Sequence, residues 1–399
     1  MAHLFRALMS GTFNTFSVVA YCASPEGTKT FATKHVVIVG GGYAGIALAN
    51  GLKGKCQFTL IDPKECFHHN LGALRACVEK GYAANTFIPY KPTYGDHFKQ
   101  GTVIKTDAAS KKVVLEGGEE VPYDYLVLAT GTTGYFPGKL DLVIHKDVPR
   151  TIKMYDNVVD KIQAARDIVI IGGGPAGIEL SGEIVADMKG KKVTLIHSRT
   201  GLINNAPSLT DKFRKSLHDK LVQYGVNVLM DQRVTNLNEI ENGELRQCRV
   251  KTDKGNTVTA DLVFVCTGMK TNTSAYSSTF ADKMDNIGCL KVDKNLRVCG
   301  TTDVYAIGDC STADEQAKMA FKAGMHAKLV ADNIQADVEG KALKPYKPMG
   351  VMMCVPIGRN AGVTQMKTWV VGDFISRKLK GQGLFTQRYW ASMKQTMPK

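Results

Sequence analysis

Close cysteine pairs and long apolar runs are both missing from this chain of 399 residues. The ten cysteines form no C-x-x-C spacing and no cluster, which argues against a disulfide scaffold and a zinc site and favours reduced thiols. No apolar run reaches the roughly 18 residues that a membrane-spanning helix requires. Hydrophobic residues make up 44% and charged residues 22%, as in a globular protein long enough for about two or three domain cores.

Acidic residues are nearly absent from the end of the chain. From Gly340 to Lys399 the only acid is Asp373, against eleven lysines and arginines, so this segment carries +10 of the net charge of +14. Such an excess attracts phospholipid or nucleic acid, and a merely solvated basic face is the alternative. Aromatic residues and leucines alternate with the charges, including Phe385 and Trp390, and this favours a membrane interface.

Two glycine fingerprints are present, each directly after an apolar β-type run and directly before a helical pattern. In G-x-G-x-x-G the first glycine permits a tight turn, the second lets the backbone approach a pyrophosphate, and the third lets the helix pack on the strand. The helix N-terminus then attracts the phosphates. Two such units predict electron transfer between a bound flavin and a pyridine nucleotide. The predicted binding residues are Gly40, Gly41, Gly42, Tyr43, Ala44 and Gly45 in the first fingerprint and Gly172, Gly174 and Gly177 in the second.

The residue that ends the second strand of each unit distinguishes the two nucleotides. In the first unit this residue is Asp62, whose carboxylate can accept hydrogen bonds from the ribose hydroxyls of FAD. The second unit has His197 and Arg199 in the corresponding place and no acid. Because a cation tolerates a 2′-phosphate, we expect NADPH to be accepted as well as NADH, and the sequence leaves the preference open.

Three further segments predict contacts with the cofactors. Ala129, Thr130 and Gly131 follow a buried strand and form a small-residue turn, and Gly268 follows the matching strand of the second unit. Asp309 ends a later apolar run and is expected to accept a hydrogen bond from the flavin ribitol. The helix that begins near Lys318 and Met319 would direct its N-terminus at the flavin pyrimidine, where its dipole stabilises the reduced anion. Lys318 adds a formal charge there, unless it is simply an exposed lysine.

Glu179 lies two residues after the second fingerprint, on the expected first turn of the helix. A carboxylate there can hold the nicotinamide carboxamide, while the alternative is an acid that the helix dipole favours. The adjacent His68 and His69 do not form a metal site, because neighbouring residues of a strand point to opposite faces and no partner ligands are suitably spaced. A structural or flavin-lining role is the preferred interpretation.

The sequence therefore predicts an α/β protein with two Rossmann-like dinucleotide-binding domains and a small α+β C-terminal region. We expect the FAD domain over residues 35–145 and 276–340, the NAD(P)H domain over 146–275, and a basic membrane- or quinone-facing region over 341–399. Residues 1–34 form an extension that has some features of a mitochondrial targeting segment, with a disordered extension as the alternative.

The assembled motifs resemble those of apoptosis-inducing-factor-like flavoproteins, which act as FAD-dependent NAD(P)H:quinone oxidoreductases. The resemblance runs from about His35 to the C-terminus through GGGYAGIA, FHHN-x-x-ALRA, LATGTTGYFPGK, GGGPAGIE, VTLIHS, CTGMKTNTSAY, VYAIGDC and KMAFKAGMHA. It implies FAD, or its 6-hydroxylated form, and two-electron reduction of ubiquinone and vitamin K. It also implies that Arg75 and Val103 line the FAD site and that Lys380 lies near the quinone end.

One feature departs from this family, whose members of this type are typically placed on membranes by an N-terminal myristoyl group. The chain begins Met1-Ala2 and lacks the glycine that this modification requires. This departure argues against placement on the plasma membrane or a lipid droplet by such an anchor. We still expect peripheral attachment at the cytosolic face of a lipid droplet, plasma membrane or mitochondrial outer membrane, with mitochondrial import as an alternative. The enzymatic alternatives are a type II NADH dehydrogenase and a monodehydroascorbate-type reductase. A redox-sensing, pro-apoptotic DNA-binding flavoprotein is the alternative from another class, and the oligomeric state is left open.

Overall fold

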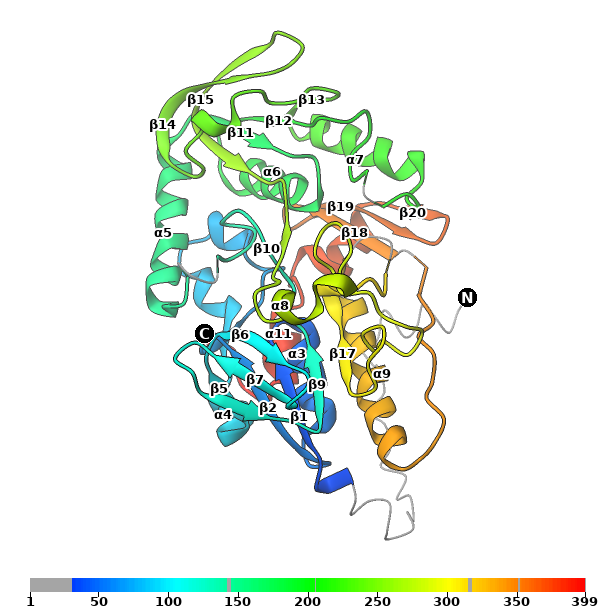
Figure 1. Cartoon of the computed structure of the whole chain (residues 1–399). Helices are drawn as coiled ribbons and strands as arrows, with labels where there is room; N and C mark the ends of the chain where they lie inside the picture. Colours follow the sequence, from blue (N-terminus) through cyan, green and yellow to red (C-terminus); the bar gives the residue numbers. More distant parts are fainter. Residues whose placement is uncertain (1–30, 142–144, 205, 315–317, 351, 399) are drawn as a thin grey trace.

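The computed structural model describes residues 31–141, 145–204, 206–314, 318–350 and 352–398. Residues 1–30, which make up most of the predicted extension, lie outside this part of the chain. The described residues form an α/β protein with two parallel sheets of the dinucleotide-binding type and a third, smaller sheet, which confirms the predicted fold class (Figure 1).

The first sheet has five parallel strands in the order β17-β9-β1-β2-β5. Apart from the edge strand β5, its strands are largely buried and rich in valine, isoleucine and leucine, as expected when helices or other layers cover both faces. The chain leaves this sheet after β9 and returns to it only at β17, so two distant segments build one unit. The strand bounds are β1 His35–Val39, β2 Gln57–Asp62, β5 Phe98–Gln100, β9 Tyr125–Leu128 and β17 Val304–Ala306.

The second sheet lies in one continuous stretch of the chain, in the order β13-β12-β11-β15-β14. All of its pairings are parallel except that of the edge strand β14 with β15. Helix α6 follows β11 through the second glycine turn and covers this sheet (Figure 1). The bounds are β11 Asp167–Ile171, β12 Lys192–Ile196, β13 Asn227–Leu229, β14 Leu245–Lys251 and β15 Thr257–Val265.

The third sheet, β18-β19-β20, is antiparallel and belongs to the C-terminal region. It packs on α6, and the approach is closest at Gly182, where an added Cβ would lie 2.7 Å from the Cα of Ile357. Apolar residues of this sheet, of α6 and of the second sheet share one core cluster, so the C-terminal region is continuous with the second unit. The bounds are β18 Met352–Ile357, β19 Ala361–Met366 and β20 Trp369–Val371.

Helices cover the sheets and connect the units. The last helix lies beside α3 of the first unit, where Trp390 and Met393 join the core around that helix (Figure 1). No helix among the described residues is long and apolar enough to cross a membrane. The α-helices are α3 Tyr43–Leu52, α4 Lys91–Tyr94, α5 Val148–Ala164, α6 Pro175–Asp187, α7 Asp211–Gln223, α8 Ser277–Phe280, α9 Ala320–Val338, α10 Asp373–Ser376 and α11 Thr386–Ser392.

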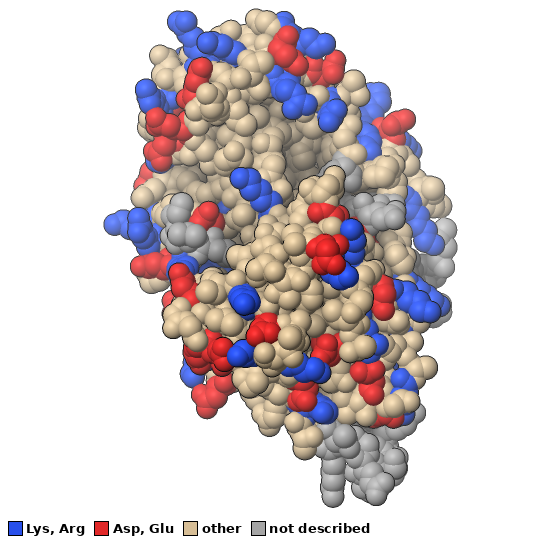
Figure 2. Space-filling view, in the orientation of Figure 1, with Lys and Arg blue, Asp and Glu red and all other residues tan. Residues whose placement is uncertain are grey.

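Short strands and single turns complete the structure. The strands form three small sheets, and a π-helical turn continues α10 over Arg377–Gly381. On the face shown in Figure 2, lysines and arginines are interspersed with aspartates and glutamates and do not gather in one basic patch. The short strands are β3 Cys66–His68, β4 Phe87–Pro89, β6 Val103–Asp107, β7 Lys112–Leu115, β8 Glu120–Pro122, β10 Thr132–Thr133 and β16 Lys270–Thr271, and the 3-10 turns are η1 Arg75–Cys77, η2 Tyr82–Thr86, η3 Gly95–His97, η4 Leu237–Glu239, η5 Ala281–Lys283 and η6 Gly308–Cys310.

Candidate active site

Both glycine fingerprints form tight turns from a strand into a helix. At the first glycine of each turn the backbone is left-handed, with φ of +106° at Gly40 and +120° at Gly172. A Cβ at Gly45 would overlap the carbonyl oxygen of Gly40, and a Cβ at Gly177 would overlap that of Gly172. Glycine at these positions therefore lets α3 and α6 pack closely against their strands.

The middle glycines, Gly42 and Gly174, face open space, because an added Cβ would meet no atom of the described residues within 4 Å. They are the N-cap residues of α3 and α6, and no side chain caps either helix. Helices α5 and α7, by contrast, are capped by Asp147 and Thr210. An uncapped N-terminus in front of open space offers N–H groups and the positive dipole end to phosphate. The residues present therefore fit the pyrophosphates of FAD and NAD(P)H.

The residue after the second strand makes the same contact in both units. Oδ2 of Asp62 accepts a hydrogen bond from the backbone N–H of Gly41 at 2.7 Å, and Nδ1 of His197 accepts one from that of Gly173 at 3.0 Å. Nε2 of His197 faces a loop carbonyl oxygen at 3.0 Å, so this nitrogen carries the ring proton. Arg199 is exposed and pairs with no acid among the described residues. Acceptance of both NADH and NADPH stays a prediction from these positions.

The segments predicted to contact the flavin meet at the carboxyl ends of β9 and β17. The turn Ala129–Gly131 follows β9, and Asp309 lies in η6 directly after β17. Oδ2 of Asp309 accepts a hydrogen bond from the hydroxyl of Thr132 at 3.0 Å and lies 3.6 Å from Nζ of Lys139. Dinucleotides bind at this edge of a parallel sheet, so Asp309 is well placed for the predicted role. The sequence argument did not single out Lys139.

Helix α9 begins at Ala320, with Met319 as its N-cap residue and no capping side chain. This start lies within two residues of the one expected near Lys318 and Met319. Lys318 is half-buried, and its Nζ donates a hydrogen bond to the carbonyl oxygen of Ser311 at 2.6 Å. Lys318 is therefore not the freely exposed lysine of the alternative interpretation.

A buried charged cluster that the sequence analysis did not identify lies against the first turns of α9. One oxygen of Asp314 is 3.2 Å from Nζ of Lys322, and the other is 3.1 Å from Nε2 of His326. Burial raises the pKa of Asp314, but the contacts with His326 and Lys322 outweigh it and lower this pKa. Nδ1 of His326 accepts the backbone N–H of Gly308 at 3.1 Å. The cluster thereby fixes the turn that carries Asp309.

Glu179 and Lys380 form a buried ion pair, with 2.6 Å between Oε1 and Nζ. Glu179 is the fifth residue of α6, so its expected place on the first turn is wrong by one residue. Lys380 comes from the π-helical turn after α10. Burial raises the pKa of Glu179, and the positive charge of Lys380 opposes this rise without cancelling it. Oε2 of Glu179 makes no hydrogen bond with another described residue.

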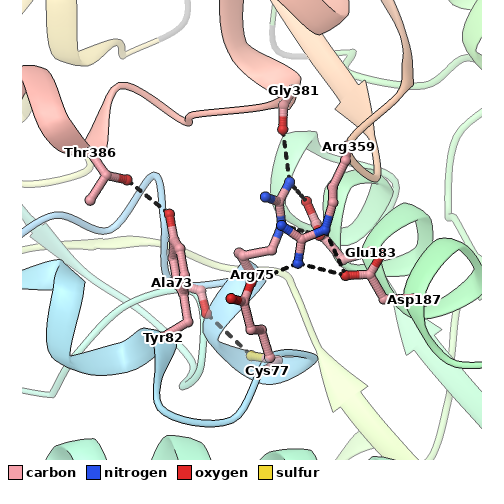
Figure 3. Close-up of polar contacts among 10 residues, drawn as sticks. Ala73, Arg75, Cys77, Tyr82, Glu183, Asp187, Arg359, Gly381 and Thr386 are labelled. Carbon is pink, nitrogen blue, oxygen red and sulfur yellow. Dashed lines mark hydrogen bonds and ion pairs between the residues drawn. The ribbon is translucent and has the colours of Figure 1, made fainter. Parts of the chain in front are cut away.

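Glu179 is the first of three acids on one face of α6, spaced four residues apart, and each of them binds a cation from elsewhere. Figure 3 shows the other two acids, Glu183 and Asp187, with their arginines. Arg75 of η1 donates to Glu183 through Nε at 2.5 Å and through Nη2 at 2.9 Å. The same Nη2 donates to the carbonyl oxygen of Gly381 at 2.8 Å. Arg75 therefore joins the first unit, α6 and the C-terminal segment at one buried point.

Arg359 makes a second junction of this kind. Its guanidinium binds Asp187 of α6 at 2.9 Å and Glu79 of the first unit at 2.6 Å, while Arg359 itself belongs to the turn between β18 and β19 (Figure 3). The i, i+4, i+8 spacing of the three acids on α6 is readable in the sequence. Their cationic partners come from distant segments and were not identified. The flavin-lining roles of Arg75 and of Val103, which is buried in β6, stay predictions. The predicted cofactor contact of Gly268, which follows β15 in the second unit, also stays a prediction.

The segment after Lys380 is held in an unusual backbone conformation. Leu384 and Phe385 have φ of +47° and +62°, values that are costly for residues with a Cβ. The carbonyl oxygen of Leu384 accepts from Nε2 of His69 at 2.8 Å, and Nδ1 of His69 lies 3.1 Å from the hydroxyl of Tyr43. His69 therefore connects the first glycine turn to the C-terminal segment. This supports the structural interpretation of His69 over a metal ligand.

The expectation that Trp390 and Phe385 rest on a membrane is wrong for the tryptophan. Trp390 is buried in the core around α3, and its Nε1 donates to the carbonyl oxygen of Asn85 at 2.8 Å. Phe385 is half-buried. The hydrophobic residues of the last helix face inward because that helix packs on the first unit, a contact that sequence periodicity alone does not distinguish from exposure to lipid.

The two cysteines after the first fingerprint do not form a redox pair. Cys66 lies in β3 and Cys77 in η1, and both thiols are buried. Burial raises the pKa of Cys66 to about 12 and that of Cys77 well above its ordinary value. A thiol reacts as its thiolate, so neither side chain is suited to exchange with a disulfide near neutral pH.

Residues 34–324 match the family model described as pyridine nucleotide-disulphide oxidoreductase. The chain belongs to this family. Ferroptosis suppressor protein 1 from Homo sapiens is 42% identical over 366 residues, which cover 91% of this chain and 97% of that protein. Apoptosis-inducing factor homolog B from Dictyostelium discoideum is 34% identical over 389 residues, covering 92% and 99%. The chain is thus an FAD-dependent oxidoreductase that uses NADH or NADPH, which confirms the predicted cofactors.

Solved structures share the fold at much lower identity. The sulfide:quinone oxidoreductase from Aquifex aeolicus superposes with a TM-score of 0.73 at 16% identity, and 92% of each chain is covered. A ferredoxin reductase from Rhodopseudomonas palustris has a TM-score of 0.62 at 22% identity, with 79% of this chain and 78% of that chain covered. These likenesses support the two-dinucleotide fold.

Proposed function

We propose that this oxidoreductase passes hydride from NADH or NADPH through FAD to lipid-soluble quinones of the ubiquinone and vitamin K type. The quinols trap lipid radicals and so protect membranes from peroxidation. The name of the relatives, ferroptosis suppressor protein 1, supports this protective role, and so do the motifs that this chain shares with quinone-reducing flavoproteins. The reaction takes place at the surface of a membrane, such as the cytosolic face of a lipid droplet, the plasma membrane or the mitochondrial outer membrane.

The buried ion pair of Lys380 and Glu179 carries this proposal. Reduction of a quinone to a quinol takes up a hydride and a proton, and NAD(P)H with one solvent proton supplies both. FAD supplies the two-electron chemistry when it is bound. Lys380 places a positive charge and an acidic N–H inside the protein, where they stabilise and protonate the quinone oxygen that becomes negative. Solvent then returns the proton to Lys380.

Glu179 serves both substrates in this arrangement. Its Oε1 orients the ammonium of Lys380, and Oε2 accepts a hydrogen bond from the carboxamide of the nicotinamide. The burial of Cys66 and Cys77 supports the same route, because both thiols have raised pKa values and are held in the unreactive protonated form. FAD would therefore exchange electrons with the acceptor without a dithiol relay at these two residues.

An acceptor panel on the purified protein tests the proposal. We expect a flavin absorption spectrum that NADH or NADPH bleaches without oxygen and that a water-soluble short-chain quinone restores. A type II NADH dehydrogenase would also use a quinone as its electron acceptor. A monodehydroascorbate-type reductase would instead reduce the ascorbate radical faster than a quinone under the same conditions. Reduced flavin that quinones fail to reoxidise would refute the quinone assignment.

A DNA-binding redox sensor is tested in parallel. Binding of duplex DNA through the basic C-terminal region would weaken steeply as salt is raised, because phosphate contacts release counterions. We expect the protein to sediment with vesicles and to leave DNA unbound at physiological salt. Tight salt-dependent DNA binding without vesicle binding would favour the alternative class.

A further inference from the structure

The C-terminal sheet has an inner and an outer face, which its register defines. Gln365 pairs with Val370 on one face, and the Gln365 side chain bonds to Ser208 and Thr210 of the second unit. Residues on the opposite face are Thr364, Met366, Trp369 and Val371, because side chains alternate along a strand and paired residues share a face. The hydroxyl of Thr364 bonds to that of Ser376 at 2.8 Å, so α10 lies on this outer face.

The outer face carries two aromatic side chains that no described residue covers. Trp369 is 62% exposed and Phe374 on α10 is 58% exposed, more than any other aromatic side chain of the described chain. Isolated exposed hydrophobic residues are ordinary on a protein surface. Two large, exposed aromatic side chains on the same side of a small sheet are unusual. Each exposes most of its ring to water, and burying that ring against a partner would be energetically favourable.

Several cations lie beside these rings in the chain or over them. The guanidinium of Arg377 lies over the ring of Phe374, 5.9 Å from its centroid. Lys367, in the turn before Trp369, and Lys378 are exposed, and within the described chain neither pairs with an acid. The single acid of the region, Asp373, is occupied by Lys220 of the second unit at 2.8 Å and by a backbone N–H of the sheet.

We propose that this outer face, consisting of Trp369 and Phe374 with Lys367, Arg377 and Lys378, docks on a bilayer that carries anionic headgroups. Aromatic rings with a polar edge favour the lipid–water interface, and lysine and arginine beside them bind the anionic phosphates. The exposed cations beside the rings match an anionic surface better than a second, equally basic copy of this chain, and the one acid, Asp373, is already paired with Lys220. The biological purpose of docking rests on the proposed quinone reduction. Docking itself does not, because vesicle binding is measured without a quinone.

This face is continuous with the active site through one helical segment. The residues from Asp373 to Gly381 form α10 and the π-helical turn, with Phe374 on the outside and Lys380 directed inward to Glu179. The two residues are six positions apart, which corresponds to roughly 9 Å at the rise of a helix. Docking of Phe374 at the headgroups therefore places Lys380 within reach of a quinone whose isoprenoid tail stays in the bilayer.

Vesicle flotation of the full-length, flavin-loaded protein tests the docking face. The variant Trp369→Ser/Phe374→Ser is compared with Ile287→Ser, which removes an equally exposed hydrophobic side chain (63%) from another part of the surface. With vesicles of phosphatidylcholine and phosphatidylserine, we expect the double variant to partition about tenfold more weakly and the control to match the parent. Omitting phosphatidylserine should weaken the parent as well.

Trp369 also reports its own position. The chain has two tryptophans, and Trp390 is already buried, so a blue shift of emission on adding vesicles arises from Trp369. The variant Trp369→Phe should lose the shift and keep flotation. Reduction of a water-soluble quinone should be unchanged in every variant, while reduction of a long-chain quinone in vesicles should fall in the double variant. If the parent protein does not reduce the water-soluble quinone, the proposed function is contradicted. The flotation result still tests the docking face, because flotation does not require quinone reduction.

Three results would overturn the docking proposal. One is flotation of the double variant equal to that of Ile287→Ser. Another is a parent protein that elutes as a dimer and becomes monomeric in the double variant, which would make this face an interface between copies. The third is loss of duplex DNA binding, without loss of vesicle binding, in the double variant.

Discussion

The ammonium of Lys380 lies 2.6 Å from the carboxylate of Glu179, although 201 residues separate them in the chain. The carboxylate belongs to the nucleotide-binding helix α6 and the ammonium to the basic C-terminal region. Both groups are about nine-tenths buried. The C-terminal region thus contributes a buried charge to the candidate active site.

Replacing one partner of this pair should cost more than replacing both. Lys380→Met leaves a buried carboxylate and Glu179→Met a buried ammonium without a counter-ion, a loss of roughly 3–5 kcal/mol. The double variant leaves no buried charge, so its free energy of unfolding should recover most of the loss. NADH:quinone activity should stay low in all three. Denaturant unfolding and steady-state rates measure the two effects. Recovery of activity together with stability would show a purely structural pair.

Arg75 and Arg359 connect the same three regions but should differ in energy. Arg75 is fully buried, so Arg75→Met leaves Glu183 unpaired and should destabilise by roughly 3 kcal/mol. Arg359 is 37% exposed, and Arg359→Met should cost about 1 kcal/mol or less, because solvent screens its pairs. Arg75→Lys, which keeps the charge and loses the two-pronged bond, should lie between them. Equal losses for Arg75→Met and Arg359→Met would contradict this view.

Gly45→Ala and Gly177→Ala form a matched pair, since each added Cβ overlaps a backbone oxygen in the same place of its turn. Gly45→Ala should be purified with little or no flavin. Gly177→Ala should keep its flavin spectrum but require a much higher NADH concentration for bleaching. Absorption spectra measure the flavin content, and NADH titrations measure the concentration needed for bleaching. Loss of flavin from Gly177→Ala but not from Gly45→Ala would show that the second unit, not the first, binds FAD.

His69 should make the protein less stable as the pH falls. Burial lowers its pKa to about 4 from an ordinary 6.5. Between these values the unfolded chain binds a proton that the folded protein does not, so the free energy of unfolding decreases by roughly 3 kcal/mol as the pH falls through this window. His69→Asn should make the stability profile shallower between pH 6.5 and 4. The buried His68 remains in the variant, so the difference isolates His69, and the half-exposed His218→Asn is the control.

His197 should control the choice between NADH and NADPH. A carboxylate at the end of this strand accepts from the ribose hydroxyls and repels a 2′-phosphate. His197→Glu should therefore raise the ratio of kcat/KM for NADH over NADPH by about tenfold or more. Arg199→Ser should raise the KM for NADPH alone. An unchanged ratio in both variants would place the discrimination elsewhere.

Several parts of the site were predictable because they depend on short segments. A glycine turn, the strand before it and the residue after the next strand lie within some 30 residues of one another, so local pattern fixes them. Asp62 and His197 occupy equivalent places for this reason. The cluster of Asp314, Lys322 and His326 was missed, since buried charges have no periodic signal and become recognisable only when their partners are in place.

The two nucleotide turns, the absence of a close cysteine pair and the basic character of the last 60 residues follow from the order of amino acids alone. Which part of that basic region faces inward depends on how the chain packs in three dimensions. Trp390 joins the core because α11 packs on α3, whereas Trp369 stays outside because the inner face of its sheet is already covered by the second unit. Both are tryptophans near lysines and arginines, and burial of apolar area depends on which surface the fold places opposite each one.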